Sequence, residues 1–160
     1  MFVVNLHNGR GQAFVDDEDA EKVLSLAPWR LLVETRRRTH YAISVVWTGG
    51  VPETFRLHRV VMHALPGEEI DHKNGNGLDC QKSNLRRATH AENMRNAKRR
   101  LDNRSGYKGV SWHAKTRTWW ARIGLDNKVL SLGRFATPEE AYAAYCEAAG
   151  KLHGRFKRLS

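Results

Sequence analysis

The sequence has few cysteines and no long apolar run, and these absences exclude several classes of protein. Two cysteines occur among its 160 residues, Cys80 and Cys146, and no Cys-x-x-Cys pair is present. A structural zinc held by four cysteines is therefore excluded, and a reducing, cytoplasmic compartment is expected. There is no run of about 18 apolar residues and no basic-then-apolar signal pattern. We therefore expect a protein that is neither secreted nor inserted in a membrane.

Acidic residues are scarce, and the excess of basic residues is concentrated towards the C-terminus. The formal net charge is +10. Lys and Arg number six against six acidic residues in residues 1–50, ten against six in residues 51–100, and eleven against five in residues 101–160. Such a field attracts phosphate polyanions with a salt-dependent affinity, although basic side chains also serve solubility alone. Composition thus favours nucleic acid as a partner without establishing it.

The most informative stretch is residues 71–96, which places a carboxylate, a histidine and two asparagines among basic residues. A neutral imidazole such as that of His72 can take a proton from water near neutral pH. Asp71 offers a hard oxygen ligand to a cation such as Mg²⁺, which keeps several waters and also binds substrate phosphates. Asn93 is the candidate second ligand, through its side-chain carbonyl. This combination predicts metal-assisted hydrolysis of a phosphodiester.

A capping box predicts the helix that carries Asn93. The Thr89 side chain would cap the helix while the Glu92 side chain reaches back to the cap residue. The helix is expected from residue 90 to about residue 98, with Asn93 in its first turn. A second short helix is expected over residues 57–65, and its apolar residues would pack beneath the site.

Two short strands are predicted around the histidine. They cover residues 68–72 and 83–87, and the Asn/Gly-rich stretch 74–77 between them is a turn signal. Neighbouring residues of a strand point to opposite faces. Asp71 and His72 therefore share a site only where the strand ends or twists.

Residues 57–98 resemble the HNH homing endonuclease family, in the variant whose third letter is asparagine. The motifs that carry the resemblance are Leu-His-Arg at 57–59, Asp-His at 71–72, Ser-Asn-Leu at 83–85 and Glu-Asn-Met-Arg-Asn at 92–96. The resemblance implies a ββα-metal core in which Asp71 and Asn93 hold one divalent cation, Mg²⁺ or Mn²⁺. It also implies that His72 is the general base and that Asn84 fixes the histidine loop.

Two further residues of this stretch are ambiguous or unusual. His58 lies in the Leu-His-Arg motif and is a candidate to assist at the site, although a lone helical histidine more often packs or forms hydrogen bonds. Cys80 stands where relatives commonly carry a polar residue such as asparagine. It lies in the loop, so little effect on the chemistry is expected.

Residues 1–56 are predicted to be a β-rich region, similar to the N-terminal region of phage-type HNH proteins. The candidate strands cover residues 2–6, 12–15, 31–35, 40–47 and 53–57. The acidic run at residues 16–19 opens a helix that ends near residue 26; it either stabilises the positive end of that helix or forms a metal site. Three arginines at residues 36–38, at an expected hairpin tip, either bind phosphate or form a solvated turn.

Residues 99–105 are interpreted as a basic linker, and residues 106–160 as a separate module of three strands and one helix. The strands are expected over residues 107–112, 118–125 and 128–132, with a turn at Asn127. Thr137 and Glu140 form a second capping box, and Gly150 is expected to end the helix. The module is therefore predicted to be a small three-stranded antiparallel sheet packed on one helix.

This module resembles the plant Apetala/ethylene-response-factor DNA-binding domain. The motifs that carry the resemblance are Gly-Tyr-Lys-Gly-Val at 106–110, Trp-Trp-Ala-Arg-Ile at 119–123, Leu-Gly-Arg-Phe at 132–135 and Glu-Glu-Ala-Tyr-Ala-Ala-Tyr at 139–145. The resemblance implies that the sheet docks in the major groove of double-stranded DNA. The residues expected on the open face are Lys108, Trp112, Lys115, Arg117, Trp120, Arg122 and Ser131, while Trp119 is expected in the core. Ser111 and His113 depart from the plant pattern, so the target sequence does not carry over.

The sequence thus predicts an α+β protein with a β-rich N-terminal region, a nuclease core and a DNA-binding module. The favoured function is a site-specific DNA endonuclease of the homing type, encoded by a phage or mobile element. It would act on double-stranded DNA in the cytoplasm of a bacterial host, as a monomer or homodimer. The alternative is a DNA-binding regulator with an inactive nuclease core, which would bind without cutting. A third reading, an RNA-binding module, predicts preference for single-stranded RNA.

Overall fold

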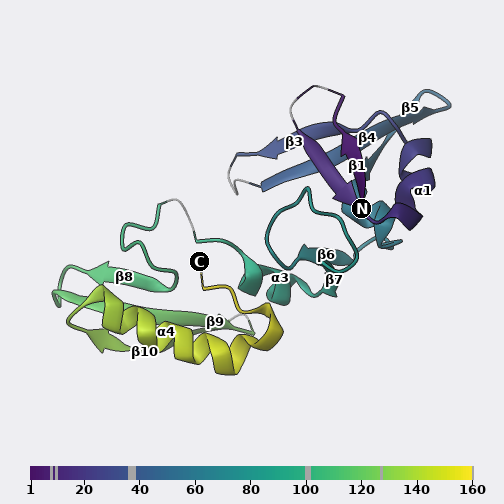
Figure 1. The fold of residues 1–160 in the computed structure, drawn as a ribbon. Helices are drawn as coiled ribbons and strands as arrows, with labels where there is room; N and C mark the ends of the chain where they lie inside the picture. The colour runs from purple at the N-terminus through teal and green to yellow at the C-terminus, as the bar shows by residue number, and fades with distance from the viewer. Residues whose placement is uncertain (8, 10, 36–38, 100–101, 127, 160) are drawn as a thin grey trace. The chain divides into compact units, whose positions relative to one another are not determined.

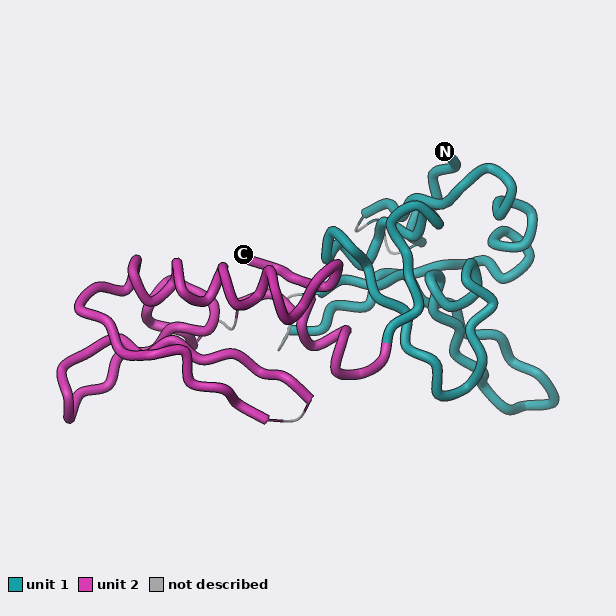
Figure 2. The backbone as a smooth tube through the Cα atoms, turned by 90° about the horizontal axis from the view of Figure 1, so that it is seen from below, with its two compact units in different colours: residues 1–88 teal, residues 89–160 magenta. Residues whose placement is uncertain are grey.

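The computed structural model describes residues 1–160 except residues 8, 10, 36–38, 100–101, 127 and 160. The chain forms two compact units, residues 1–88 and residues 89–160 (Figure 2). The three arginines at residues 36–38 and the expected turn at Asn127 lie outside the described residues. Both interpretations therefore stay predictions.

The described part of the first unit is built from small antiparallel sheets (Figure 1). One sheet pairs β1 (Phe2–Asn5) with β2 (Gln12–Val15), and another pairs β6 (Glu69–His72) with β7 (Leu85–Ala88). A three-stranded sheet has the order β3 (Arg30–Glu34), β4 (Thr39–Thr48) and β5 (Val51–Arg56). A 3₁₀ turn (Asp17–Asp19) leads into helix α1 (Ala20–Ser25), and α2 (Leu57–Val61) follows β5. The predicted strands are confirmed with shifts of one or two residues at most ends.

One apolar core joins the elements of the first unit. Val15, Val23 and Leu57 are fully buried, and they belong to the same cluster as Leu85 of β7. Trp29 is also buried, and its indole Nε1 donates a hydrogen bond to the Val23 carbonyl at 2.7 Å. A single core therefore spans the predicted boundary at residue 56, and β6 and β7 pack against it.

The second unit is a three-stranded sheet with a long helix on one face, together with the short helix α3 (His90–Asn96). Strands β8 (Val110–His113), β9 (Thr118–Leu125) and β10 (Lys128–Phe135) are antiparallel in the order β10-β9-β8, and α4 (Pro138–His153) lies along the sheet (Figure 1). Both predicted capping boxes, at Thr89 and Thr137, are present. The α+β class and the sheet packed on one helix are confirmed.

One predicted helix end in the nuclease stretch is wrong, and another is shifted by two residues. Helix α2 ends at Val61 rather than residue 65, because His63 adopts a left-handed backbone with φ of 48°. Leu65, expected to pack beneath the site, is 66% exposed. Helix α3 ends at Asn96, because Ala97 turns to an extended conformation.

The predicted end of the last helix at Gly150 is also wrong. Helix α4 continues through Gly150 to His153, and Gly154, with φ of 49°, follows it. Ala149 and His153 are buried on the helix face that meets the sheet. Their burial outweighs the cost of about 1 kcal/mol for a glycine inside a helix.

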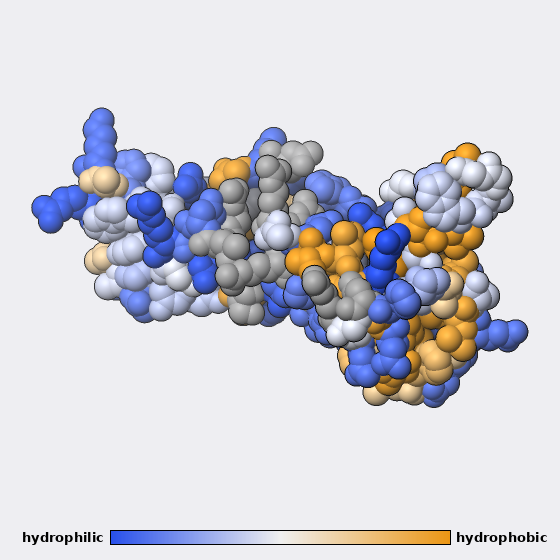
Figure 3. Space-filling view, turned by 90° about the horizontal axis from the view of Figure 1, so that it is seen from above, coloured by the Kyte–Doolittle hydropathy of each residue, from blue (hydrophilic) through white to orange (hydrophobic). Residues whose placement is uncertain are grey.

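Surface character differs between the units. On the face drawn in Figure 3, the second unit is covered mainly by hydrophilic residues, whereas apolar residues gather on the first unit. Within the described residues, no helix is both long and apolar enough to cross a membrane.

Candidate active site and DNA-binding face

His72 is the last residue of β6 and is enclosed by side chains of the first unit. Its side chain is 6% exposed. The His58 ring meets the His72 ring edge-on, with 4.9 Å between centroids, and the Tyr41 ring lies at 6.0 Å. His72 Nε2 is 3.9 Å from the Sγ of Cys80, which is itself fully buried. Cys80 therefore lies against the candidate base, a contact that its place in the sequence did not indicate.

Both histidines of this cluster are held in the neutral form. Burial lowers the pKa of His72 to about 4, although the carboxylates of Asp71 and Asp79 act to raise it. Burial lowers the pKa of His58 to about 3, and the positive charges of neighbouring groups lower it further. A neutral imidazole is the form that accepts a proton, so His72 has the protonation state of a general base at pH 7.

These lowered pKa values predict that acid destabilises the protein. In the unfolded chain both histidines titrate near pH 6.5, so between about pH 6.5 and pH 4 the unfolded state binds more protons than the native state. The free energy of unfolding should therefore fall with pH, by up to about 1.4 kcal/mol per pH unit for each histidine. Urea unfolding of the metal-free protein at pH 7 and pH 5 would measure this. His58→Gln should show a clearly smaller fall, and an unchanged fall would contradict the assignment.

Asn84 ties together the loop that follows His72. Its Oδ1 accepts the backbone N–H of Asn74 at 3.0 Å, and its Nδ2 donates to the carbonyl of Asp79 at 2.7 Å. The backbone N–H of Lys73 donates to the Asn84 carbonyl at 2.9 Å. One buried amide thus holds both ends of the loop, which are the contacts expected of the orienting residue.

Asp71 is held by an arginine from the neighbouring strand. Asp71 and Arg86 are direct partners across β6 and β7. The guanidinium donates Nε and Nη2 to Asp71 Oδ2 at 2.7 and 2.6 Å, and both side chains are largely buried. A two-point ion pair of this kind fixes the direction of a carboxylate. Asp71 and His72 have different neighbours, as adjacent strand residues should.

The oxygen donors of the motif suit a hard divalent cation. Asp71 contributes a carboxylate, and Mg²⁺ or Mn²⁺ takes oxygen ligands while keeping waters and substrate phosphates. No group of three His, Cys, Asp or Glu side chains placed to hold a metal was found among the described residues. Asn93 lies on α3 in the second unit, whereas Asp71 lies in the first. Their joint ligation, and with it the ββα-metal core, stays a prediction.

Lys108 lies elsewhere than expected. It was predicted on the open face of the sheet, but it precedes β8, and its Nζ donates to the carbonyls of Arg95 and Ala97 at 2.8 and 2.7 Å. Burial lowers the pKa of Lys108 to about 8, helped by the positive charge of Arg158. The ammonium is therefore still largely protonated at pH 7, and it binds the end of α3 rather than facing solvent.

The open face of the sheet carries a cluster of cationic and aromatic side chains around Trp120. Trp120 pairs with Ser111 on β8 and with Arg134 on β10. Its ring stacks on His113 at 3.9 Å between centroids, and the Arg134 and Arg122 guanidinium carbons lie 4.8 and 5.7 Å from its ring centroid. Such a surface offers positive charge together with a flat ring, both of which suit nucleic acid.

Arg134 and His113 belong to this face although neither was predicted there. A β-bulge in β10 between Ser131 and Gly133 shifts the register by one residue. Without the bulge, alternation from Ser131 would place Gly133 rather than Arg134 on the open face. Alternation of side chains along a strand does not show where a bulge lies, so the sequence did not predict Arg134 on this face. Alternation along the strand would have placed His113 on the same face as Ser111.

The prediction that Trp112 lies on the open face is wrong. Trp112 pairs with Trp119, and the two rings lie 5.1 Å apart. Cross-strand partners share a face, and Trp119 packs against the core beneath α4, as predicted. Lys115 and Arg117 lie in the exposed turn between β8 and β9, while Arg122 and Ser131 pair across the open face.

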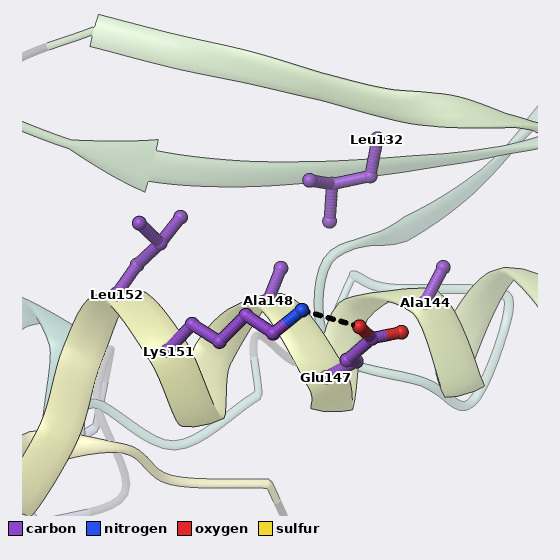
Figure 4. A pocket seen from close by; sticks show the side chains of 6 residues that line it. All are labelled: Leu132, Ala144, Glu147, Ala148, Lys151 and Leu152. Atoms are coloured by element: carbon purple, nitrogen blue, oxygen red, sulfur yellow. Dashed lines mark hydrogen bonds and ion pairs between the residues drawn. The ribbon is translucent and has the colours of Figure 1, made fainter.

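A separate pocket of the second unit lies between α4 and β10 (Figure 4). It is lined by Leu132, Ala144, Glu147, Ala148, Lys151 and Leu152. The two charged residues of this lining form an ion pair at 2.6 Å, and the other side chains are apolar. The charged groups of the pocket are therefore paired with each other.

Comparison with known proteins matches the two parts of the chain to two families. Residues 55–95 match the HNH endonuclease family, and residues 105–155 match the AP2 domain. Protein 3.8 of Escherichia phage T7 is 35% identical over 93 residues, which cover 58% of this chain and 76% of that protein. The AP2-like ethylene-responsive transcription factor AIL7 of Arabidopsis thaliana is 52% identical over 50 residues, which cover 30% of this chain but only 10% of that protein. No solved structure matches the chain.

Proposed function

This chain belongs to the HNH endonuclease family and carries an AP2 domain, and we propose that it hydrolyses phosphodiester bonds of double-stranded DNA. The two family matches together support a nuclease that acts on DNA. The observation that carries the proposed chemistry is the enclosed, neutral imidazole of His72 on a loop pinned by Asn84. A relative from phage T7 favours a phage-encoded enzyme that acts within a bacterial host. We propose that the enzyme is of the homing type and acts as a monomer or homodimer.

His72 is the proposed general base. The imidazole takes a proton from the attacking water as the water oxygen bonds to phosphorus and the bond to the 3′ oxygen breaks. The 3′ oxygen takes a proton from a second water molecule, which leaves a 3′-hydroxyl and a 5′-phosphate. Nε2 lies 3.9 Å from the sulfur of buried Cys80. His58, neutral and edge-on to the same ring, supports the orientation of His72.

Asp71 and Asn93 are the residues that would hold one divalent cation, Mg²⁺ or Mn²⁺. When bound, such an ion stabilises the negative charge that develops on the phosphate oxygens. Arg86 fixes the direction of the Asp71 carboxylate. Asn84 acts on the reaction through the loop that carries His72.

The AP2 domain is the proposed reader of the DNA. We propose that its open face contacts the duplex through Lys115, Arg117, Trp120, Arg122, Ser131, His113 and Arg134. The major groove admits antiparallel β-strands, and this sheet presents such strands on its open face. Selectivity would come mainly from this face, and the nuclease motif would contact the backbone and cut.

Removal of Arg134 should weaken DNA binding more than removal of an equal charge elsewhere. Arg134→Gln removes a guanidinium from the Trp120 cluster, and we expect an affinity loss of about tenfold together with a shallower salt dependence. Fluorescence anisotropy with selected duplex DNA at several salt concentrations would measure both. Lys151→Gln, which removes the same charge from an exposed position on α4, is the control. Equal losses in the two variants would contradict a role for this face.

Cleavage of selected DNA tests the proposed function. Duplexes bound by the native chain would be selected from a random pool, cloned into a supercoiled plasmid and incubated with Mg²⁺, Mn²⁺ or EDTA. We expect nicking or linearisation with metal, none with EDTA, and loss of activity in Asp71→Asn. If plasmid that carries the bound site stays intact with both metals, the alternative is correct, and the chain is a DNA-binding regulator with an inactive nuclease core.

A further inference from the structure

Helix α3, which carries Asn93, is part of the same compact unit as the AP2 domain. The sequence suggested instead that α3 belongs to the nuclease core and that a linker separates it from the reader. Residues 89–160 nevertheless form one unit, and α3 packs against the 3₁₀ turn Gly154–Phe156 that follows α4. The following inference rests on the proposed function, because it concerns the helix that would supply a metal ligand.

Lys108 satisfies the C-terminal end of α3. Its ammonium donates to the carbonyls of Arg95 and Ala97, at 2.8 and 2.7 Å. The last carbonyls of a helix have no partner within it, and this end has no glycine cap because Ala97 turns directly to an extended conformation. A positive group is also the favoured partner for the negative end of a helix. Lys108 therefore supplies both the hydrogen bonds and the charge that this end requires.

The backbone around Lys108 is itself held in place. Ser105 Oγ accepts the N–H of Tyr107 at 3.1 Å and donates to the carbonyl of Val110 at 2.9 Å. Asn103 Nδ2 donates to the Tyr107 carbonyl at 2.8 Å. Hydrogen bonds thus hold the backbone before and after Lys108, at the start of the three-stranded sheet.

Arg95 and Asn96 connect α3 to its surroundings at other points. Arg95 pairs with Asp126 in the turn after β9, at 2.9 Å, but the Asp126 side chain is 78% exposed, so solvent screens the pair. Asn96 is buried at 6% exposed. A helix of seven residues is too short to be stable on its own. Its conformation therefore depends on what the rest of the unit supplies, and Lys108 supplies two part-buried hydrogen bonds at its C-terminal end.

We propose that Lys108 is a positioning residue for cleavage, because it fixes the end of α3 and thereby the placement of Asn93. The AP2 domain then has two roles, since its sheet reads DNA and its lysine holds the catalytic helix. Removing the lysine would slow cutting at saturating enzyme without a matching loss of DNA affinity. This distinguishes Lys108 from the residues of the open face, whose loss affects binding first.

The test compares Lys108→Met with Lys151→Met in the full chain. Both substitutions remove one positive charge from the second unit, and Lys151 is exposed on α4. The readouts are the single-turnover cleavage rate of plasmid with the bound site at saturating enzyme, the dissociation constant in EDTA, and amide hydrogen exchange in residues 90–97. For Lys108→Met we expect a cleavage rate at least tenfold lower, a dissociation constant within threefold of the control, and at least tenfold faster exchange in α3. Lys108→Arg, which keeps a charged donor, should restore most of the rate.

The outcomes distinguish a failure of the role of Lys108 from a failure of the proposed nuclease function. If Lys108→Met cuts as fast as Lys151→Met and its α3 amides exchange equally slowly, the role of Lys108 is overturned while the nuclease assignment stands. If the native chain does not cut DNA that carries its bound site, the proposed function fails and this inference fails with it. If Lys108→Met does not fold, Lys108→Gln replaces it. Its amide can donate to one carbonyl, so an intermediate rate is expected, and a native rate would overturn the role.

Discussion

Replacing His72 with alanine is expected to abolish metal-dependent cleavage and to leave DNA binding nearly unchanged. The imidazole is the neutral, buried base of the proposed reaction, and removal of a general base typically slows the chemical step by about 10² to 10⁴. The single-turnover cleavage rate and the dissociation constant of the same DNA would be measured together. Binding should survive because the proposed DNA-binding face belongs to the second unit.

The control for this experiment is His7→Ala, which removes an exposed imidazole of the same unit. Thermal unfolding of both variants would show whether lost activity reflects lost structure, because His72→Ala also leaves space beside Cys80 and His58. Parallel losses of cleavage and binding in His72→Ala, with the fold intact, would reject its role as the base.

Replacing Gly109 with alanine is expected to destabilise the second unit severely. Gly109 has φ of 76°, and an added Cβ would lie 2.1 Å from Cδ2 of Tyr145 and 2.8 Å from the carbonyl oxygen of Arg122. Tyr145 is buried between α4 and the sheet, so it has little room to move. Overpacking of a core together with a left-handed backbone predicts a loss of about 3 kcal/mol or more. Thermal or urea unfolding followed by tryptophan fluorescence would measure it.

Gly106→Ala separates the two causes of that loss. Gly106 has a similar φ of 81°, but an added Cβ would meet no atom within 4 Å. Its substitution should therefore cost only the backbone strain, about 1 kcal/mol. If the two alanine variants were equally stable, the close packing of Tyr145 on Gly109 would not matter to the fold.

Local signals in the sequence identified most elements of the fold and the first members of the site. The capping boxes at Thr89 and Thr137 are encoded by residues three apart, and both are present. The strands Gln12–Val15 and Thr118–Leu125 have the predicted bounds, because their alternation is bordered by clear turns. The role predicted for Asn84, holding the loop after His72, matches its hydrogen bonds.

Other features of the fold and the site depend on packing between segments that are distant in the sequence. Helix α4 runs through Gly150 because Ala149 and His153 are buried, and burial depends on the sheet beneath. The bulge in β10 brings Arg134 onto the open face, and cross-strand pairing turns Trp112 away from it. The contact between Cys80 Sγ and His72 Nε2 depends on how the loop between β6 and β7 folds back.

The sequence by itself determined the two families, the order of the elements and the identity of the chemical groups, because these depend on residue types and short spacings. Only the tertiary structure decided which partner each group has. Lys108 is the clearest case, since its place in the AP2 motif predicted a DNA contact, whereas its ammonium binds carbonyls of α3 some eleven to thirteen residues earlier in the chain. A hydrogen bond of that kind depends on where two segments meet in space, and no periodicity within either segment specifies it.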